Sequence, residues 1–415
     1  MNDSMFKKLP NHGGIVPRYD GFSTVNLVSS LLKHYGVREL PSPVLDSSIL
    51  KTGLFDGVKN VVFVIVDALG YNQLRHYMSS GAMPNMERFV KNAEDGNGLF
   101  QPLTTVFPST TAAALTAIYT GAIPTKHGLS SFSAYIPEIE DVANLVFSYS
   151  FSDGKKIENF HPFLQQPSIS QFLSDMNITS TSITDKSFKG SLLSAVHHRA
   201  SVFSGYSFPS TIPTLAVDAL RANEQNFISV YWPGLDACAH KYGPFSKETE
   251  DEAHAVDATF NRIVQQLKDT KGGMDDTLFV LTADHGQVLN DEDQSLNLNS
   301  HPELLSKLRL PPAGERRSLY LYPKKGGEQA VREWAQEKGA TVFTREEAQL
   351  IGLVGDDKMD ANWAKRIGEL IVLPPGKSQW VYDPPMAGGS LSFFRGAHGG
   401  LHEDEMLVPC LMWRG

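Results

Sequence analysis

Three runs of apolar residues along the chain each lead into an acidic residue. They are NVVFVIV before Asp67, NFISVYW leading to Asp236, and DTLFVLTA before Asp284. Unbroken runs of Val, Ile and Phe are typical of parallel strands that are buried on both faces. Parallel strands present the residues that follow them at the carboxyl edge of the sheet, where open α/β folds place their active sites. The pattern therefore predicts an enzyme built on a parallel sheet.

Apolar residues at helical spacing predict the helices around this sheet. Residues 21–36 form one such segment, which ends at a glycine. A proline opens a second helix over residues 83–90. The alanine-rich stretch 111–119 is a strong helix former, and Gly121 closes it. Helices alternating with buried strands favour an α/β fold.

Residues 246–270 have the most regular amphipathic pattern. Thr249 and Glu252 stand at the spacing of a capping box near the start of this segment. The apolar positions form a single stripe, made of Val256, Phe260, Ile263, Val264 and Leu267. The stripe predicts a long helix that buries one face against the sheet.

The pattern changes in two parts of the chain. Residues 135–210 are rich in Ser, Phe and Pro with weak periodicity, which predicts a loop-rich excursion with short helices. Residues 290–395 contain their own short strands and helices, ending in ELIVLPPGKSQWVYDP, which resembles a hairpin. We expect residues 1–289 and 396–415 to form the catalytic core, and residues 290–395 to form an inserted α+β cap subdomain.

Composition narrows the function. The chain has 415 residues and a net charge of −9, so it lacks the basic face that nucleic-acid scaffolds require. An acidic protein can still act on phosphate esters if bound metal ions supply positive charge. The two cysteines, Cys238 and Cys410, predict neither a disulfide framework nor a zinc knuckle. We find neither a signal peptide nor a run of about 18 apolar residues, so we expect a cytoplasmic protein without a membrane span.

Histidines near the strand-end acids are candidate metal ligands. Asp236 and His240 are four residues apart, and a helical turn would let them converge on one ion. His285 follows Asp284 directly, and His398 lies between small residues that allow close backbone approach. Each motif alone is equally typical of a helix cap or an ordinary loop histidine. Their placement at strand ends favours the metal interpretation.

Thr111 is the candidate nucleophile. It begins the alanine-rich helix, where free N–H groups and the helix dipole favour an anion. A threonine hydroxyl becomes a good nucleophile when a divalent metal lowers its pKa. Thr110 and Thr111 could instead serve merely as a helix N-cap.

Five segments, in this order along the chain, carry a family resemblance. They are VIVDALG, FPSTTAAALTAIYTGAIPTKHG, GLDACAHKYGP, TADHGQ and GAHGGLHEDEMLVP. Together they resemble the alkaline phosphatase superfamily, most closely its type I phosphodiesterase/nucleotide pyrophosphatase-like branch. The resemblance covers residues 59–285 and resumes near residue 394. It implies an alkaline-phosphatase-like three-layer α/β core with a mostly parallel sheet between helices, plus the smaller cap.

The resemblance also implies roles for single residues. The family nucleophile lies ten residues before the glycine that closes its helix, which selects Thr111 by counting back from Gly121. The implied ligands form two sets: Asp67, Thr111, Asp284 and His285 for one ion, and Asp236, His240 and His398 for the other. Carboxylate and imidazole ligands without thiolate suit zinc, with manganese as the alternative. We therefore expect two divalent ions, preferably Zn²⁺.

The implied activity is metal-dependent hydrolysis of a small-molecule phosphoric ester through a covalent phospho-threonine, of the phosphodiesterase or pyrophosphatase type. A phosphomonoesterase or phosphonate-cleaving relative with the same metals is the first alternative, and a non-catalytic metal-binding protein is the second. The family places a phosphoryl-binding asparagine where this chain has Ser131 or Phe132. Ser130, Ser131 or the Thr111 backbone N–H could donate instead. The natural substrate and the oligomeric state stay open.

Other conspicuous residues have ordinary interpretations. His127 is expected to be structural, and His402 to lie on the surface or cap a helix. The cluster His197-His198-Arg199 could recognise substrate anions, but such a cluster is more typical of solvated surface, which is what we expect. Tyr231 lies near the predicted metals and could contact substrate or belong to the core.

Overall fold

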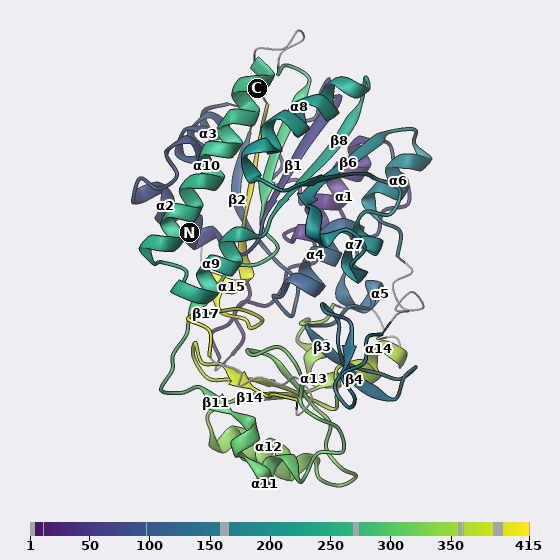
Figure 1. The fold of residues 1–415 in the computed structure, drawn as a ribbon, viewed down its shortest axis with the longest axis vertical. Helices are drawn as coiled ribbons and strands as arrows, with labels where there is room; N and C mark the ends of the chain where they lie inside the picture. The colour runs from purple at the N-terminus through teal and green to yellow at the C-terminus, as the bar shows by residue number, and fades with distance from the viewer. Residues whose placement is uncertain are drawn as a thin grey trace.

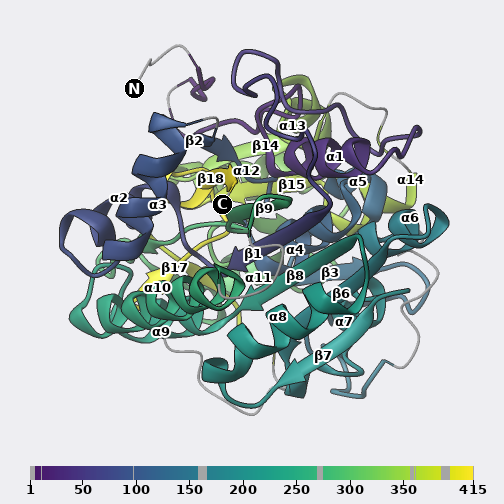
Figure 2. The ribbon, with the colours of Figure 1, turned by 90° about the horizontal axis from the view of Figure 1, so that it is seen from above.

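The computed structural model describes residues 5–10, 12–96, 98–157, 166–268, 274–355, 359, 361–384 and 393–414. Figure 1 shows a large α/β unit above a smaller unit that contains a second sheet. Seen from above, helices lie on both faces of the large sheet (Figure 2). The three-layer α/β core predicted from the sequence is confirmed. The described residues contain no helix with the length and apolarity that a membrane crossing requires.

The central sheet has seven strands in the described residues. In spatial order they are β2 (Leu99–Thr104), β18 (Leu407–Arg414), β9 (Thr277–Thr282), β1 (Asn60–Val66), β8 (Asn226–Trp232), β6 (Thr179–Asp185) and β7 (Val202–Tyr206). Strand β18 is antiparallel to both of its neighbours, and the other neighbouring pairs are parallel. All residues of β1, β8 and β9 are buried, which explains their unbroken apolar sequences.

Helices cover both faces of this sheet (Figure 2). One face carries α1 (Thr24–His34), α4 (Thr111–Thr120) and α6 (Ile169–Asp175), and the other carries α3 (Pro84–Asp95), α8 (Ile212–Ala222) and α10 (Lys247–Lys268). The apolar stripe predicted for α10 is buried in the core. Residues 269–270 of that predicted helix lie outside the described part of the chain.

The helix predicted at 246–270 begins at Lys247, but the capping box predicted for it is wrong. The side chain of Ser246, rather than Thr249, accepts a hydrogen bond from a backbone N–H, that of Thr249, at 3.2 Å. Glu252 does not reach back to the helix start, because its carboxylate accepts a hydrogen bond from the indole N–H of Trp232 at 2.7 Å. The preceding serine is therefore the better cap.

The loop-rich excursion expected at residues 135–210 is also wrong. Strands β6 and β7 lie in this segment and complete the edge of the central sheet. The sequence of β6, TSTSITD, lacks a run of apolar residues, although five of its seven residues are buried. Ser and Thr side chains inside a sheet hide the strand from a search for hydrophobic runs.

The second sheet combines two distant segments of the chain. Its strands are β14 (Thr341–Thr344), β15 (Leu370–Leu373), β13 (Leu319–Leu321), β12 (Ala313–Gly314), β3 (Ser133–Ile136), β4 (Asp141–Asn144) and β5 (Tyr149–Ser150). Four strands come from the predicted cap at 290–395, and three come from residues 133–150. The helices α12 (Glu328–Glu337), α13 (Arg345–Leu350) and α14 (Ala361–Arg366) accompany this sheet (Figure 1).

The hairpin predicted from ELIVLPPGKSQWVYDP is wrong. Strand β15 pairs with β13 and β14, whereas β16 (Trp380–Val381) pairs in parallel with β11 (Leu296–Asn297). The two strands therefore belong to different sheets. The short spacing in the sequence predicted that β15 and β16 pair with each other, but each pairs with strands from other parts of the chain.

A buried ion pair joins the second sheet to the core. The guanidinium of Arg317, just before β13, donates to both carboxylate oxygens of Glu405, at 2.7 and 2.8 Å. Glu405 lies in α15 (Glu403–Met406) and also accepts from the backbone N–H groups of Gly400 and His402. The pair therefore fixes the chain that follows His398.

We predict that Arg317→Met destabilises the protein by about 3–5 kcal/mol, because it leaves the Glu405 carboxylate buried without its cation. The exposed pair of Arg309 and Glu369 supplies the control, since Arg309→Met should cost under about 1 kcal/mol. Urea unfolding of both variants in a chelator measures the difference. Equal losses in the two variants would show that the buried pair contributes no more than a surface pair.

Candidate active site at the sheet edge

Three adjacent strands bring three carboxylates to one edge of the central sheet. Strand β1 lies between β8 and β9, in parallel with both. Asp67 follows β1 directly, Asp284 follows β9, and Asp236 lies in α9 (Gly234–Tyr242) after β8. The backbone N–H of Asp67 donates to the carbonyl of Trp232 at 2.9 Å, which joins two of these strand ends.

The first cluster contains Asp67, Asp284 and His285. One ligand atom from each residue lies within 4.8 Å of the others, and all three residues are buried. Nε2 of His285 is 3.6 Å from Asp67 Oδ1 and 3.5 Å from Asp284 Oδ2. These two carboxylate oxygens are buried and have no hydrogen-bond donor in the structure. Buried carboxylate oxygens without donors fit a bound cation.

The second cluster contains Asp236, His240 and His398, again within 4.8 Å of one another. Nε2 of His240 lies 3.3 Å from Asp236 Oδ2, across one turn of α9. Nε2 of His398 lies 3.8 Å from Asp236 Oδ1. His398 follows β17 (Gly396–Ala397), and its ring stacks on that of His285 with 3.9 Å between centroids. The two clusters therefore adjoin.

The backbone sets the tautomer of all three imidazoles. Nδ1 faces a carbonyl oxygen in His240 (Gly396, 2.8 Å), in His285 (Gly286, 3.1 Å) and in His398 (Ser109, 3.1 Å). A carbonyl can only accept, so each neutral ring carries its proton on Nδ1. Each Nε2 then presents its lone pair to the cluster, as metal-binding histidines do.

The pKa shifts of the clustered residues also favour cation binding at both clusters. Burial, reinforced by Asp284 and Asp236, raises the pKa of Asp67 well above its usual value. Burial likewise raises the pKa of Asp284. Burial and the neighbouring His285 and His240 hold the pKa of His398 well below its usual value. The His398 imidazole and the acids Asp67 and Asp284 therefore belong to a ligand set that a divalent cation would stabilise in its binding form.

A surrounding set of donors orients the acids. The hydroxyl of Tyr231 donates to Asp67, and the amide of Gln287 donates to Asp236. The backbone N–H groups of Ala68 and His285 both donate to one oxygen of Asp284, at 3.2 and 2.9 Å. The other oxygen of each first-cluster acid is thereby directed toward the cluster. Tyr231, which the sequence left between substrate and core roles, holds a candidate ligand.

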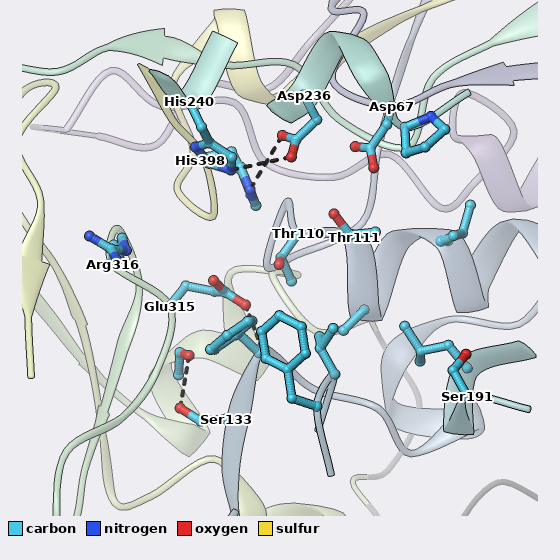
Figure 3. A pocket seen from close by; sticks show the side chains of 18 of the residues that line it. Asp67, Thr110, Thr111, Ser133, Ser191, Asp236, His240, Glu315, Arg316 and His398 are labelled. Atoms are coloured by element: carbon cyan, nitrogen blue, oxygen red, sulfur yellow. Dashed lines mark hydrogen bonds and ion pairs between the residues drawn. The ribbon is translucent and has the colours of Figure 1, made fainter. Parts of the chain in front are cut away.

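Thr111 lies beside both clusters at the N-terminus of α4 (Figure 3). Its Oγ1 is 3.2 Å from Nε2 of His285. Thr110 occupies the N-cap position with extended backbone, φ −137°, but its side chain makes no capping hydrogen bond. The alternative that the two threonines serve merely as a cap therefore lacks its expected contact.

A cavity of about 880 Å³ opens beside Thr111 and the two clusters. Figure 3 shows Asp67, Asp236, His240 and His398 along one side, with Thr110 and Thr111 below them. Residues of the core, of the segment 132–151 and of the segment 312–384 all contribute to its wall. The cavity therefore lies where the two sheets of the molecule meet.

Glu315 and Arg316 line this cavity, and sequence reasoning missed both (Figure 3). The Glu315 carboxylate accepts from the backbone N–H of Phe132, and burial raises its pKa to about 7. The Arg316 guanidinium lies 3.8 Å from the centroid of the Phe394 ring. Both residues stand in a turn between β12 and β13, and no local pattern distinguishes this turn from an ordinary charged loop.

The two serines expected to replace the family asparagine are not in place. Phe132 lines the cavity, whereas Ser130 and Ser131 are buried outside the described lining. The Ser131 hydroxyl donates instead to the Ser133 carbonyl at 2.6 Å. The Thr111 backbone N–H stays a candidate donor because it lies in the first turn of α4.

The structure agrees with the roles predicted for His127 and His402 but not with the role predicted for the histidines at 197 and 198. His127 is buried, accepts from the Leu129 N–H at 3.2 Å and lies outside the described cavity lining, as expected for a structural residue. His402 caps α15 by accepting from the Asp404 N–H at 3.1 Å. The solvated surface expected for residues 197–199 is wrong, because His197 is buried and, with His198, lines the cavity. Their helix, α7 (Leu192–His197), packs against α4.

We predict that Tyr231→Phe lowers metal affinity about 10- to 100-fold, because Asp67 loses the hydroxyl that orients it. Tyr206→Phe is the matched control, since its hydroxyl donates to the Tyr231 backbone carbonyl at 3.1 Å rather than to a candidate ligand. Titration with Zn²⁺ against a competing chelator measures both affinities. Unchanged metal affinity in Tyr231→Phe would show that the Tyr231 hydroxyl does not support metal binding through Asp67.

Comparisons with known proteins agree with this arrangement. Residues 61–401 match the family described as type I phosphodiesterase / nucleotide pyrophosphatase. Bis(5'-adenosyl)-triphosphatase ENPP4 of Homo sapiens is 24% identical over 230 residues, which cover 54% of this chain and 47% of that protein. The chain thus spans about half the length of the curated relatives it matches.

Solved structures share the fold at low sequence identity. Human ectonucleotide pyrophosphatase / phosphodiesterase 5 has a TM-score of 0.64 and 17% identity over 85% of this chain and 87% of its own. The murine protein, with AMP and described as inactive with one threonine replaced by alanine, has a TM-score of 0.64 and 16% identity over the same shares. Phosphonoacetate hydrolase of Sinorhizobium meliloti 1021 has a TM-score of 0.62 and 17% identity over 85% of this chain and 89% of its own.

The family match extends over most of the chain and contains every strand end that carries a candidate ligand. The chain belongs to the type I phosphodiesterase / nucleotide pyrophosphatase family.

Proposed function

We propose that this protein is a metal-dependent phosphodiesterase that acts through Thr111. The observation that carries the proposal is the position of the Thr111 hydroxyl, which lies at a helix N-terminus, 3.2 Å from His285 Nε2, in a residue that lines the cavity. Such a helix terminus favours an anion. The murine relative described as inactive with a threonine replaced by alanine supports a threonine-dependent reaction.

Two divalent cations, preferably Zn²⁺, would be held by the two clusters. Asp67, Thr111, Asp284 and His285 would hold one, and Asp236, His240 and His398 the other. When bound, such ions lower the pKa of a coordinated hydroxyl and neutralise charge on phosphoryl and leaving-group oxygens. The carboxylate and imidazole donors fit zinc, and manganese is the alternative.

The chain's own residues position the reaction. Thr111 Oγ loses its proton and forms a bond to phosphorus while the bond from phosphorus to the leaving-group oxygen breaks, and that oxygen takes up a proton. This step gives a phospho-threonine that retains the other ester group. Water then attacks phosphorus, the bond to Thr111 Oγ breaks, and the threonine recovers its proton. The product is a phosphate monoester. The N-terminal N–H groups of α4 face the position of a non-bridging oxygen.

We predict that Thr111→Ala lowers kcat on bis(p-nitrophenyl) phosphate by roughly a thousandfold or more, because the reaction loses its nucleophile. Thr111→Ser should retain most of the activity, since it keeps the hydroxyl. Thr110→Ala is the neighbouring control and should lose much less. Mass spectrometry after acid quench should find the phosphoryl adduct on residue 111. Activity that survives Thr111→Ala in metal-replete enzyme would contradict the covalent mechanism.

We also predict a preference for diesters over monoesters, because the cavity wall is mainly apolar and, among the described lining residues, Arg316 is the one Lys or Arg that could meet a second phosphate charge. The value of kcat/KM for bis(p-nitrophenyl) phosphate should exceed that for p-nitrophenyl phosphate at least about tenfold. A reversed preference would favour the phosphomonoesterase alternative. Turnover of neither ester, with metals bound, would favour a binding protein.

A further inference from the structure

The side chain of Gln287 reaches from the first cluster to the second. Gln287 stands two residues after His285, yet its amide donates to the Asp236 carboxylate and, at 3.2 Å, to the Asp236 backbone carbonyl. The residue is fully buried. It lies directly before β10 (Val288–Leu289), which pairs with β17 ahead of His398. Gln287 therefore lies among the segments that carry the second cluster.

The backbone of β17 leaves room for this side chain only because residue 396 is a glycine. A Cβ on Gly396 would lie 2.3 Å from Gln287 Oε1 and 2.4 Å from the Ala239 carbonyl oxygen. The Gly396 carbonyl oxygen in turn faces Nδ1 of His240 at 2.8 Å. The amide of Gln287 is therefore held in one place, packed between α9 and β17.

The amide of Gln287 is only partly satisfied. Its Oε1 is buried, and none of the described residues donates a hydrogen bond to it. A buried acceptor without a partner costs free energy that an apolar side chain of similar shape would avoid. The hydrogen bonds of the NH₂ group go to Asp236. A glutamine at this position is therefore explained by its contact with a candidate ligand rather than by packing.

This contact determines which oxygen of Asp236 is available to a cation. Gln287 Nε2 donates to Asp236 Oδ1, whereas Oδ2 lies 3.3 Å from Nε2 of His240. A carboxylate that is fixed through one oxygen presents the other in a constant direction. Such fixed ligands bind metal ions more tightly than ligands that are free to turn.

The first cluster has separate supports. Asp67 accepts from the Tyr231 hydroxyl, and Asp284 accepts from two backbone N–H groups. The clusters also differ in burial, since the side chains of the first are at most 5% exposed and those of the second are 10–19% exposed. Loss of one support should therefore affect one cluster and not the other.

We propose that Gln287 is a positioning residue for Asp236, which sets the cation affinity of the second cluster and leaves that of the first unchanged. The assignment rests on the proposed two-metal function and adds to it a residue outside the ligand set. It implies that the two ions can be lost separately, although their clusters adjoin.

Backgrounds that keep one cluster test the assignment. His240→Ala disables the second cluster, and Asp284→Asn disables the first. Gln287→Met keeps the shape of the side chain and removes the donor, so it should lower Zn²⁺ affinity about 10- to 100-fold in the Asp284→Asn background. It should leave the affinity unchanged in the His240→Ala background. Titration with Zn²⁺ against a competing chelator measures both pairs of proteins.

The otherwise native chain supplies a second measurement. Gln287→Met should weaken one of the two stepwise Zn²⁺ affinities, and Tyr231→Phe should weaken the other. Gln287→Met should also lose hydrolysis of bis(p-nitrophenyl) phosphate at limiting Zn²⁺ and regain it with excess Zn²⁺. Misfolding would not show this rescue, and urea unfolding of the metal-free variants checks that each is folded.

Gln73→Met is the matched control. Gln73 is also buried with no donor to its Oε1 among the described residues, but its amide donates to the backbone carbonyl of Gln287 at 2.6 Å rather than to a candidate ligand. This variant should keep both affinities. Equal losses from Gln287→Met in the two backgrounds, or a loss in neither, would overturn the assignment. A native protein that binds fewer than two divalent ions would instead defeat the proposed function.

Discussion

The site depends on the convergence of like charges at one buried sheet edge. Asp67, Asp236 and Asp284 reach this edge because β8, β1 and β9 are adjacent and parallel. Burial and the neighbouring carboxylates raise the pKa values of Asp67 and Asp284, so the folded chain holds a ligand set that is costly without cations. Backbone carbonyls fix three imidazole tautomers and add to this preorganisation. Metal binding should therefore contribute to stability as well as to chemistry.

The parts of the fold that sequence predicts well are those with a strong local signal. The central strands are unbroken apolar runs in the sequence because they are buried on both faces. Helix α10 shows one apolar stripe because it is buried on one face. The seven candidate ligands are recognisable for a related reason, since each lies in a motif at a strand end or a helix start. Their convergence follows from topology, which places the ends of parallel strands together.

Other parts carry no such signal. Strand β6 is buried through Ser and Thr side chains, and the second sheet assembles from residues 133–150 and 313–373, which no local pattern could join. Glu315 and Arg316 reach the cavity from a turn of that sheet, and His197 enters it on a short helix. The roles of these residues depend on long-range packing, so their sequence context resembles ordinary surface.

The candidate ligands and the cavity wall come from different parts of the fold, which matters for substrate specificity. The chemistry rests on strand ends whose positions the central sheet fixes, whereas the cavity wall comes from α4, α7 and the second sheet. The Arg317–Glu405 pair ties that sheet to the chain carrying His398, so the specificity wall and the second cluster are held in one frame. Substitutions in the wall can therefore change the organic group that is accepted while leaving the ligands in place. Family membership thus constrains the reaction more tightly than the substrate.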